Sequence, residues 1–306
     1  MPKLLLLRHT SSISLVFFLL FIPVTVILLA QDPAKSTPME GSTTDPAAHA
    51  KIGLKPPANP KLPTLFLVGD STVRNGHADG AGGQWGWGEP LVDLFDTSKV
   101  NVDNRAIGGR SSRSYIMEGQ WAETLTFVKP GDIILFQWGH NDDGPLDDPA
   151  RARGTLHGIG NETKEIENPI LKIHETVHTY GWYLRKYVAD TLAKGATPII
   201  CSPIPRKIWK DGKVVRNSAN YGGWARQIAE QEHVGFIDLN EIIGRRYDVL
   251  GEADVEPLFA DPHTHTSWAG AELNAECVVA GLKALPRDPV AAYFSAKGKA
   301  VAPYVQ

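Results

Sequence analysis

The chain lacks the features of a disulfide-stabilised or nucleic-acid-binding protein. It has only two cysteines, Cys201 and Cys277, and both lie in apolar patterns, so we expect two buried free thiols. No cysteine lies near the N-terminus, which excludes a lipid-modified bacterial terminus. The formal net charge is −3, so there is no excess of positive charge to hold a polyanion, and nucleic acid is not an expected partner.

The chain has one long apolar stretch, and it lies at the N-terminus. Lys3 and Arg8 precede hydrophobic residues 13–30. This order is typical of a secretory signal peptide over residues 1–30, and it predicts a secreted or periplasmic protein. The stretch is also close to the ~20 residues that span a bilayer, so an uncleaved membrane anchor is the alternative.

The rest of the chain divides into a leader and one domain. Residues 31–63 are rich in Pro, Ser, Thr, Ala and Lys, and they have too few large apolar residues to repay the entropy of ordering. We therefore expect a flexible leader. Residues 64–306 are long enough for one α/β domain with a full core.

Short apolar runs and helical patterns alternate along this domain. Buried strands are predicted at residues 65–68, 100–107, 133–138, 197–201 and 234–239. Helices are predicted at residues 90–95, 112–127, 170–194, 219–232, 240–249 and 267–285. This alternation predicts a parallel sheet with helices on both faces. Residues 143–169 have no clear period and follow the third strand, so they form an insertion at the carboxyl edge, where ligands bind in such sheets.

A candidate catalytic set follows these strands. Ser71 comes directly after the first strand, through Gly69 and Asp70, where a turn would expose its hydroxyl. A serine nucleophile needs a base, and His265, in the loop before the last helix, is the best one available. Asp261 is the local carboxylate that could orient the imidazole ring.

The same edge offers donors for a developing oxyanion. We expect the backbone N–H groups of Ser71 and Gly109 and the side-chain amide of Asn141 to form the hole. Gly109 allows close approach of the backbone, and Asn141 offers two donors without charge. Asp70 and Asp142 are expected to be structural acceptors in these loops.

Four segments of the chain, in order, resemble the conserved motifs of the SGNH (GDSL-type) hydrolase superfamily. Their sequences are most similar to those of rhamnogalacturonan acetylesterases. They are GDST at 69–72, NRAIGGRSSRS at 104–114, GHND at 139–142 and HTHTS at 263–267. The resemblance implies an α/β fold, a three-layer α/β/α sandwich of about five parallel strands in flavodoxin-like order, over residues 64–306. It also implies a serine esterase that removes O-acetyl groups from a plant cell-wall polysaccharide such as rhamnogalacturonan, with no cofactor or metal.

One departure from the family concerns the acidic residue. The family places its Asp three residues before the catalytic His, but Pro262 occupies that position here and Asp261 lies four residues before His265. Either the loop adjusts and Asp261 completes a triad, or Ser71 and His265 work as a dyad with a backbone carbonyl on the imidazole.

Substrate contacts are predicted less specifically. Arg110 and Arg113 could pair with substrate carboxylates such as galacturonate, or could brace their loop with Asp103 or Glu118. Trp138 and Trp268 lie beside the motifs and could stack on sugar rings or pack in the core.

Three other functions use the same residues. The machinery could act on another acyl ester, such as acetylxylan or a lipid. A metal-dependent hydrolase could use His140, Asp142, His263 and His265 as ligands, but this reading leaves Ser71 and Asn141 without a purpose. A non-catalytic carbohydrate-binding domain would likewise have no use for an intact Ser, Asn and His set.

Overall fold

The computed structural model describes residues 55–75 and 80–305. The chain divides into two compact units, Met1–Thr37 and Pro38–Gln306, and every described residue belongs to the second. The predicted signal peptide and most of the predicted leader therefore lie outside the described residues. Within the described part, no helix is both long and apolar enough to cross a membrane.

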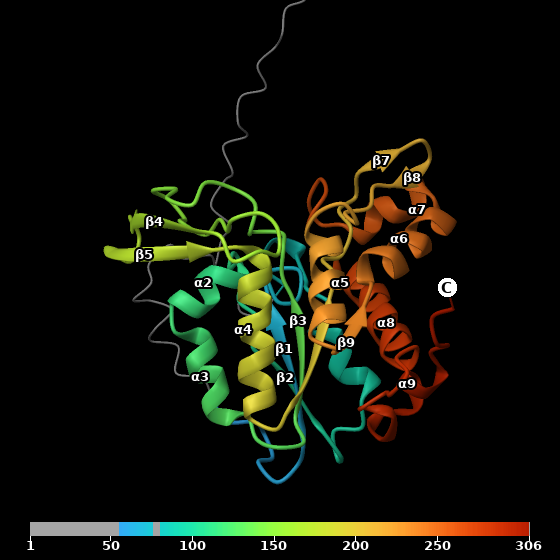
Figure 1. Ribbon diagram of the computed structural model, residues 1–306. Helices are drawn as coiled ribbons and strands as arrows, with labels where there is room; N and C mark the ends of the chain where they lie inside the picture. The colour runs from blue at the N-terminus through green and yellow to red at the C-terminus, as the bar shows by residue number, and fades with distance from the viewer. Residues whose placement is uncertain (1–54, 76–79, 306) are drawn as a thin grey trace, which may run out of the picture. The chain divides into compact units, whose positions relative to one another are not determined.

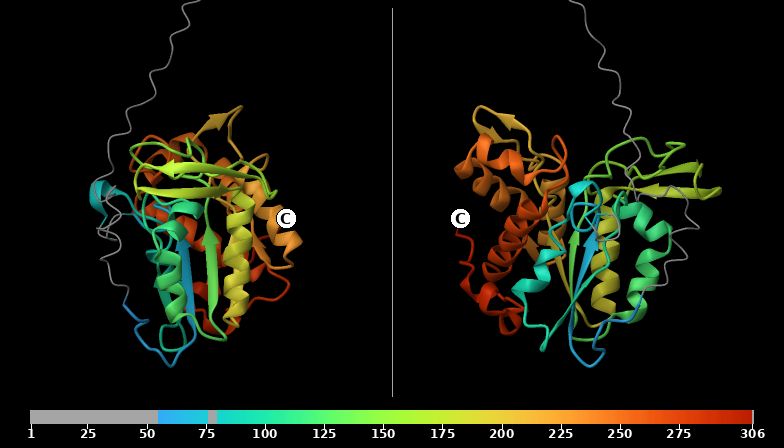
Figure 2. Two further views of the ribbon diagram at one scale, coloured as in Figure 1. Left: turned by 60° about the vertical axis from the view of Figure 1, so that its left-hand side comes forward. Right: turned by 180° about the vertical axis from the view of Figure 1, so that it is seen from behind.

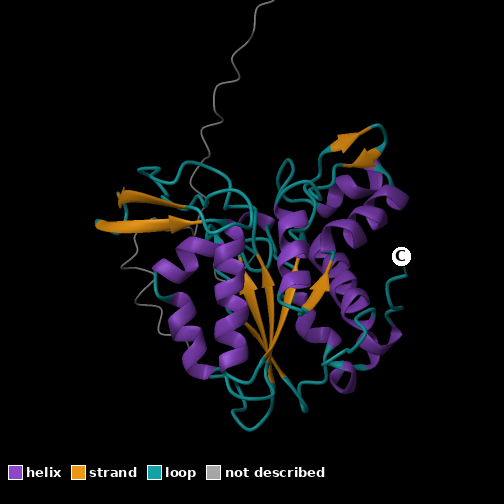
Figure 3. Ribbon diagram, in the orientation of Figure 1, coloured by secondary structure: helices purple, strands orange, loops and turns teal. Residues whose placement is uncertain are grey.

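The centre of the domain is a parallel sheet of five strands in the order β2-β1-β3-β6-β9 (Figures 1 and 3). The strands are β1 (Thr64–Gly69), β2 (Asn101–Asn104), β3 (Ile133–Gln137), β6 (Thr197–Cys201) and β9 (Gly235–Ile237). The predicted fold class, with its flavodoxin-like order, is confirmed. Because the strands are parallel, their carboxyl ends meet at one edge of the sheet.

Side chains alternate between the two faces of the sheet, and each face has its own hydrophobic core. Leu65 and Leu67 of β1 join one core, and Phe66 and Val68 join the other. The first core includes the 3-10 helix η2 (Pro90–Leu94), α6 (Leu239–Leu250) and α8 (Trp268–Lys283). The second includes α2 (Ser112–Met117), α3 (Gln120–Phe127), α4 (Tyr180–Ala193) and α5 (Tyr221–Gln231), so helices cover both faces (Figure 2).

The predicted helix over residues 170–194 is wrong in its first part. Its first residues form β5 (Ile173–His178), which pairs antiparallel with β4 (Thr163–Asn168) inside the insertion. In β5 the buried side chains are Glu175 and Val177, the two-residue period of a strand. Helix α4 begins only after Thr179, whose side chain caps it by accepting from the N–H of Trp182.

The predicted helix over residues 112–127 is two helices. Gly119 lies between α2 and α3 with a φ of 81°, a left-handed conformation that a continuous helix cannot contain. The capping box of Ser111 and Ser114 starts α2. The other predicted helices agree with η2, α5, α6 and α8 to within a few residues.

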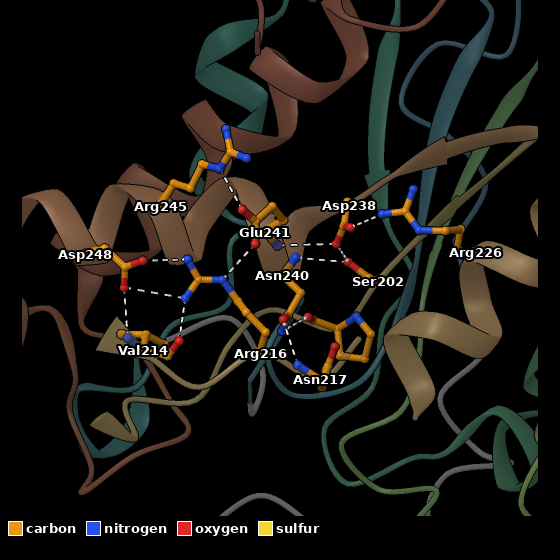
Figure 4. Close-up of polar contacts among 11 residues, drawn as sticks. Ser202, Val214, Arg216, Asn217, Arg226, Asp238, Asn240, Glu241, Arg245 and Asp248 are labelled. Carbon is orange, nitrogen blue, oxygen red and sulfur yellow. Dashed lines mark hydrogen bonds and ion pairs between the residues drawn. The ribbon is translucent and has the colours of Figure 1, made fainter. Parts of the chain in front are cut away.

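A second hairpin, absent from the sequence prediction, joins β7 (Trp209–Lys210) to β8 (Lys213–Val214). Arg216 fixes it to α6 through ion pairs with Asp248 and Glu241, at 2.7 and 2.9 Å (Figure 4). The N–H of Val214 also donates to Asp248. The remaining short elements are η1 (Ala81–Gly83), α7 (Glu252–Val255), η3 (Glu256–Leu258), η4 (Ala291–Tyr293) and α9 (Ala296–Ala300).

Cys201 and Cys277 are both buried and unbridged, as the sequence predicts. Burial raises the pKa of both thiols, because a thiolate would lose its hydration there. Both side chains belong to the core that contains α6 and α8, so they act as small hydrophobic residues.

Candidate active site

The nucleophile turn follows β1 directly. Gly69 ends the strand where no side chain fits, because an ideal Cβ would lie 2.6 Å from Val73 Cγ2 and 2.7 Å from the Gln137 carbonyl oxygen. The N–H groups of Val73 and Arg74 then both donate to the Asp70 carbonyl and close the turn. Ser71 lies within this turn, at the carboxyl edge of the sheet, and its surface is 4% exposed.

A buried polar network supports the turn from below. Asp70 accepts hydrogen bonds from the Thr72 N–H and hydroxyl at 2.9 and 2.7 Å. Gln137 donates to Thr72, and Trp87 donates to Gln137. The second Asp70 oxygen lies 3.4 Å from His140 Nδ1. Burial alone would raise the pKa of Asp70, but His140 and Thr72 outweigh burial and lower it, so Asp70 holds the turn as a carboxylate.

Ser71, His265 and Asp261 form one hydrogen-bonded chain. His265 Nε2 lies 2.8 Å from the Ser71 hydroxyl oxygen, although the two residues are 194 positions apart. His265 Nδ1 lies 2.5 Å from Asp261 Oδ2. The imidazole therefore has the serine hydroxyl on one side and a carboxylate on the other, which is the geometry of a nucleophile, its base and the group that orients the base.

The loop before α8 folds around Asp261, and this lets Asp261 reach His265 although it lies four residues before the histidine and not three. The other oxygen, Oδ1, accepts backbone N–H bonds from His263, Thr264 and His265 at 3.0, 2.6 and 3.0 Å. Burial would raise the pKa of Asp261, but the bond from His265 and these N–H bonds outweigh burial and hold the pKa well below its ordinary value. The Nδ1 atom of His265 therefore contacts the Asp261 carboxylate, as in a triad. The alternative of a Ser71 and His265 dyad would place a backbone carbonyl there.

The turn after β2 brings Gly109 to the nucleophile. The Ile107 N–H donates to the Gly69 carbonyl at 3.0 Å, and an ideal Cβ on Gly108 would lie 3.6 Å from Ser71 Cβ. Gly109 itself has a φ of 77°, a left-handed conformation that favours glycine. The backbone of this turn can therefore approach a group bound at Ser71 closely.

Asn141 lies in the loop after β3 and is 8% exposed. Its amide donates to the Arg110 carbonyl at 2.9 Å, which ties this loop to the turn that contains Gly109. A side-chain amide has two N–H donors, so one remains for a ligand. All three residues predicted for the oxyanion hole lie at the carboxyl edge.

Asp142 joins the same two loops from beneath. Its Oδ2 accepts the Gly139 N–H at 2.9 Å. Its Oδ1 accepts the Ser112 N–H at 3.1 Å and makes a very close contact with the Ser112 hydroxyl. Burial raises the pKa of Asp142 to about 7 in spite of these bonds. The residue acts as a structural acceptor, in agreement with the sequence analysis.

The structure contradicts two of the predicted substrate contacts. Arg113 is fully buried, and its Nε and Nη2 bind the two oxygens of Glu175, both at 2.7 Å. Its Nη1 donates to the carbonyls of residues 146 and 154, so no substrate can reach the guanidinium. Trp138 is also fully buried and stacks on Tyr187, which leaves no face for a sugar.

The other two predicted contacts have different outcomes. Arg110 is 6% exposed and pairs with Glu118 at 2.7 Å, so it braces its loop, which was the second of its two predicted roles. Trp268 is 40% exposed and packs edge-on against Trp85, with ring centroids 4.7 Å apart. The backbone N–H of Trp85 donates to the carbonyl of Thr266, which follows His265 in the chain. An indole is therefore open to solvent near the site, and sugar stacking on it stays a prediction.

The ligands of the metal alternative do not converge. Across residues 55–75 and 80–305, no group of three or more His, Cys, Asp and Glu side chains could hold a metal ion. His140 Nε2 lies 3.1 Å from the Ile204 carbonyl oxygen, and His263 Nδ1 contacts the Thr264 hydroxyl at 2.6 Å. These histidines contact separate groups, and His265 contacts Ser71 and Asp261.

Two cations at the site were not found from the sequence. Arg153 donates to the Gly109 carbonyl at 2.8 Å, and Arg206 reaches the His140 carbonyl at 3.4 Å. Arg153 lies in the insertion, and Arg206 lies in the loop after β6. Neither belongs to a motif, so no pattern in the sequence distinguishes it from other arginines.

Comparisons with known proteins agree with this geometry. Residues 67–273 match the model of the GDSL-like lipase/acylhydrolase family. A rhamnogalacturonan acetylesterase of Emericella nidulans is 32% identical over 213 residues, which are 70% of this chain and 82% of that protein. A probable rhamnogalacturonan acetylesterase of Bacillus subtilis, YesY, is 30% identical over 226 residues, which are 72% and 93% of the two chains.

A solved structure gives the same fold. The crystal structure of YxiM from Bacillus subtilis is 25% identical with a TM-score of 0.58. The match covers 73% of this chain but 56% of that protein, so the chain spans little more than half of YxiM. The family model covers most of the domain, and the motifs that carry it meet at one edge of the sheet. This chain belongs to the GDSL-like lipase/acylhydrolase family and is a carboxylic ester hydrolase.

Proposed function

We propose that this protein removes O-acetyl groups from rhamnogalacturonan, with Ser71 as the nucleophile. The hydrogen-bonded chain from Ser71 through His265 to Asp261 carries the chemical part of the proposal. The substrate class is supported by two relatives, at 32% and 30% identity, named a rhamnogalacturonan acetylesterase and a probable rhamnogalacturonan acetylesterase. Fold alone would not specify the sugar.

The first step is acetyl transfer to the enzyme. The Ser71 hydroxyl oxygen attacks the acetyl carbonyl carbon while its proton passes to His265 Nε2, 2.8 Å away. Asp261 holds Nδ1 protonated and stabilises the imidazolium that forms. His265 then gives the proton to the sugar oxygen as the ester bond breaks, which releases the sugar hydroxyl and leaves acetyl-Ser71.

The carbonyl oxygen becomes negative in this step and needs donors. The backbone N–H groups of Ser71 and Gly109 and the second N–H of Asn141 serve this purpose. Because these donors are fixed before the substrate arrives, they stabilise the charge without reorganisation during the reaction. Asp142, which holds the Gly109 turn and the Asn141 loop together, keeps them in place.

The second step is hydrolysis of the acetyl-enzyme. His265 removes a proton from water, and the water oxygen attacks the acetyl carbon. The same donors hold the second oxyanion. When the bond to Ser71 breaks, the serine recovers its proton from His265 and acetate leaves.

The same proposal includes a location outside the cytoplasm, because residues 1–30 have the pattern of a signal peptide. N-terminal sequencing of the protein from the medium, periplasm and membrane fraction tests this part. A mature chain that begins near Gln31 supports secretion, whereas a membrane-bound chain that keeps residues 1–30 supports the anchor.

Acetate release from three substrates tests the function. Acetylated rhamnogalacturonan, acetylated xylan and a triglyceride are compared at equal ester concentration, with Ser71→Ala as the control for uncatalysed release. We expect the highest kcat/KM on rhamnogalacturonan. A higher kcat/KM on xylan or triglyceride would identify that ester as the preferred substrate. No acetate or fatty-acid release from any of the three would contradict the proposal.

A further inference from the structure

Two arginines of the described chain differ from those that make ion pairs. The group that makes ion pairs consists of Arg74, Arg105, Arg110, Arg113, Arg216, Arg226 and Arg245. Arg153 and Arg206 make no ion pair with any described residue, and both contact backbone carbonyls of the active-site loops. Arg206 is exposed and its contact is long, at 3.4 Å. Arg153 is partly buried and its bond is short, at 2.8 Å.

The backbone that follows Arg153 is fixed. The Thr155 N–H donates to the Asp142 carbonyl at 2.9 Å, and the Gly154 carbonyl accepts from the buried Arg113. Gly154 passes so close to residue 144 that an ideal Cβ would lie 2.3 Å from its carbonyl oxygen. This segment therefore holds the Arg153 guanidinium against the Gly109 carbonyl, on the turn that approaches Ser71.

The charge of Arg153 is incompletely compensated. Burial, and then the charge of Arg151, lower its pKa to about 10, although Asp142 and Asp70 oppose this shift. Arg153 is thus still a cation at neutral pH. A cation that is partly removed from water is stabilised when an anion binds to it.

We propose that Arg153 binds a uronate carboxylate of the substrate chain while an acetyl ester of that chain lies at Ser71. The inference rests on the proposed function, in which the pectic substrate contains galacturonate. A guanidinium presents five N–H donors in a planar fork that matches a carboxylate, and among described residues Arg153 spends one of them, on Gly109. Arg153 thereby takes the role that the sequence analysis gave to Arg110 and Arg113, whose guanidinium groups bind Glu118 and Glu175.

Arg153→Gln tests this role with two substrates that differ in charge. On acetylated rhamnogalacturonan oligosaccharides we expect KM to rise about tenfold or more, the effect of losing a hydrogen bond to a charged group. On p-nitrophenyl acetate, which has no carboxylate, the variant loses only the bond to the Gly109 carbonyl, so KM should rise much less than on the acidic substrate. Arg153→Lys keeps the charge without the fork and should fall between the two enzymes on the acidic substrate.

Arg185→Gln is the matched control. Arg185 is also partly buried, and it donates to the carbonyls of residues 159 and 160 and to the Asn161 side chain. We expect it to leave KM for both substrates unchanged. An equal rise in KM for Arg185→Gln would show a general effect of lost positive charge and would contradict a site at Arg153.

The remaining outcomes separate the inference from the proposed function. If wild-type enzyme releases acetate from the oligosaccharides and Arg153→Gln does so with the same KM, the inference is wrong and the function stands. If Arg153→Gln loses turnover equally on both substrates, Arg153 is structural. The same conclusion follows if Arg153→Gln unfolds at a lower temperature than wild type and Arg153→Lys has the wild-type KM on the acidic substrate. If wild-type enzyme releases no acetate from them, the proposed function fails, and the inference fails with it.

Discussion

Asp261 and Asp142 are both active-site carboxylates that accept backbone N–H bonds, yet their pKa values shift in opposite directions. Asp261 accepts three N–H bonds and contacts His265, and its pKa is lowered. Asp142 accepts two N–H bonds and contacts the Ser112 hydroxyl, and its pKa is raised to about 7. The difference lies in burial and in the partners, because Asp142 is fully buried, its hydrogen bonds come from neutral donors, and the charge of Asp70 adds to the effect of burial.

The comparison shows how one fold uses two carboxylates for two purposes. A charged carboxylate beside an imidazole orients the ring and stabilises its protonated form. A fully buried carboxyl group holds two loops together, and its raised pKa reduces the negative charge that it carries beside the oxyanion hole at neutral pH, where a full charge would oppose the developing oxyanion. Substitution at each position should therefore change different observables.

The largest effect is expected from loss of the charged carboxylate. Asp261→Asn should lower kcat by up to about ten-thousandfold, because an amide favours the wrong tautomer and cannot stabilise the imidazolium. His265→Ala should be at least as damaging. Turnover on p-nitrophenyl acetate is measured across a range of pH, so that a displaced optimum is not mistaken for lost turnover. Activity within a few fold of wild type at every pH would support the dyad of Ser71 and His265.

The next effect concerns the donor on the loop that Asp142 holds. Asn141→Ala should lower kcat by roughly a hundred- to a thousandfold, because one donor to the oxyanion is lost. KM should change little, since the bond strengthens only in the transition state. Steady-state kinetics give both constants, and a defect confined to KM would show that Asn141 binds the substrate in its ground state.

A smaller effect should distinguish the two carboxylates by pH. The Asp142 pKa of about 7 in the folded chain lies above about 3.9 in the unfolded chain, so its stabilising contribution is full below about pH 4 and is lost as pH rises through about 7. The Asp261 pKa is lowered on folding, so its contribution is present above about pH 4 and is lost as pH falls below that.

Thermal unfolding from pH 4.5 to 8 compares the two variants with wild type. The Tm difference between wild type and Asp142→Asn should shrink as pH rises, because Asn does not titrate. The difference for Asp261→Asn should stay nearly constant over the same range. A constant or growing difference for Asp142→Asn would mean that Asp142 is ionised in the folded protein, and the contrast between the two carboxylates would be lost.

Local patterns in the sequence predicted most of the fold and the centre of the site. Short apolar runs predicted the strands because a strand buried on both faces needs apolar side chains at every position. The position of Ser71 after one strand and Asn141 after another was sufficient to bring them to one edge, because parallel strands end there together. The spacing of Asp261 left its role open, and the loop geometry, with three N–H bonds to Oδ1, shows how it reaches His265.

Features that depend on long-range pairs were not predictable in this way. Arg113 is buried because Glu175, 62 residues away, provides its counter-charge, and nothing near Arg113 in sequence indicates this. The sequence predicts a helix over β5 because a short apolar pattern fits both periods, and only pairing with β4 decides between them. Arg153 is at the site because its insertion folds back onto Gly109.

The central claim is that Ser71 forms the covalent intermediate, and active-site labelling tests it most directly. The wild-type enzyme is treated with an organophosphonate that reacts with serine esterases, and its peptides are analysed by mass spectrometry. We predict one modified peptide, the one that contains Ser71, with activity lost in proportion to labelling, and no labelling of folded Ser71→Ala. Labelling at another residue, or a Ser71→Ala enzyme that keeps most of its activity on p-nitrophenyl acetate, would contradict the account.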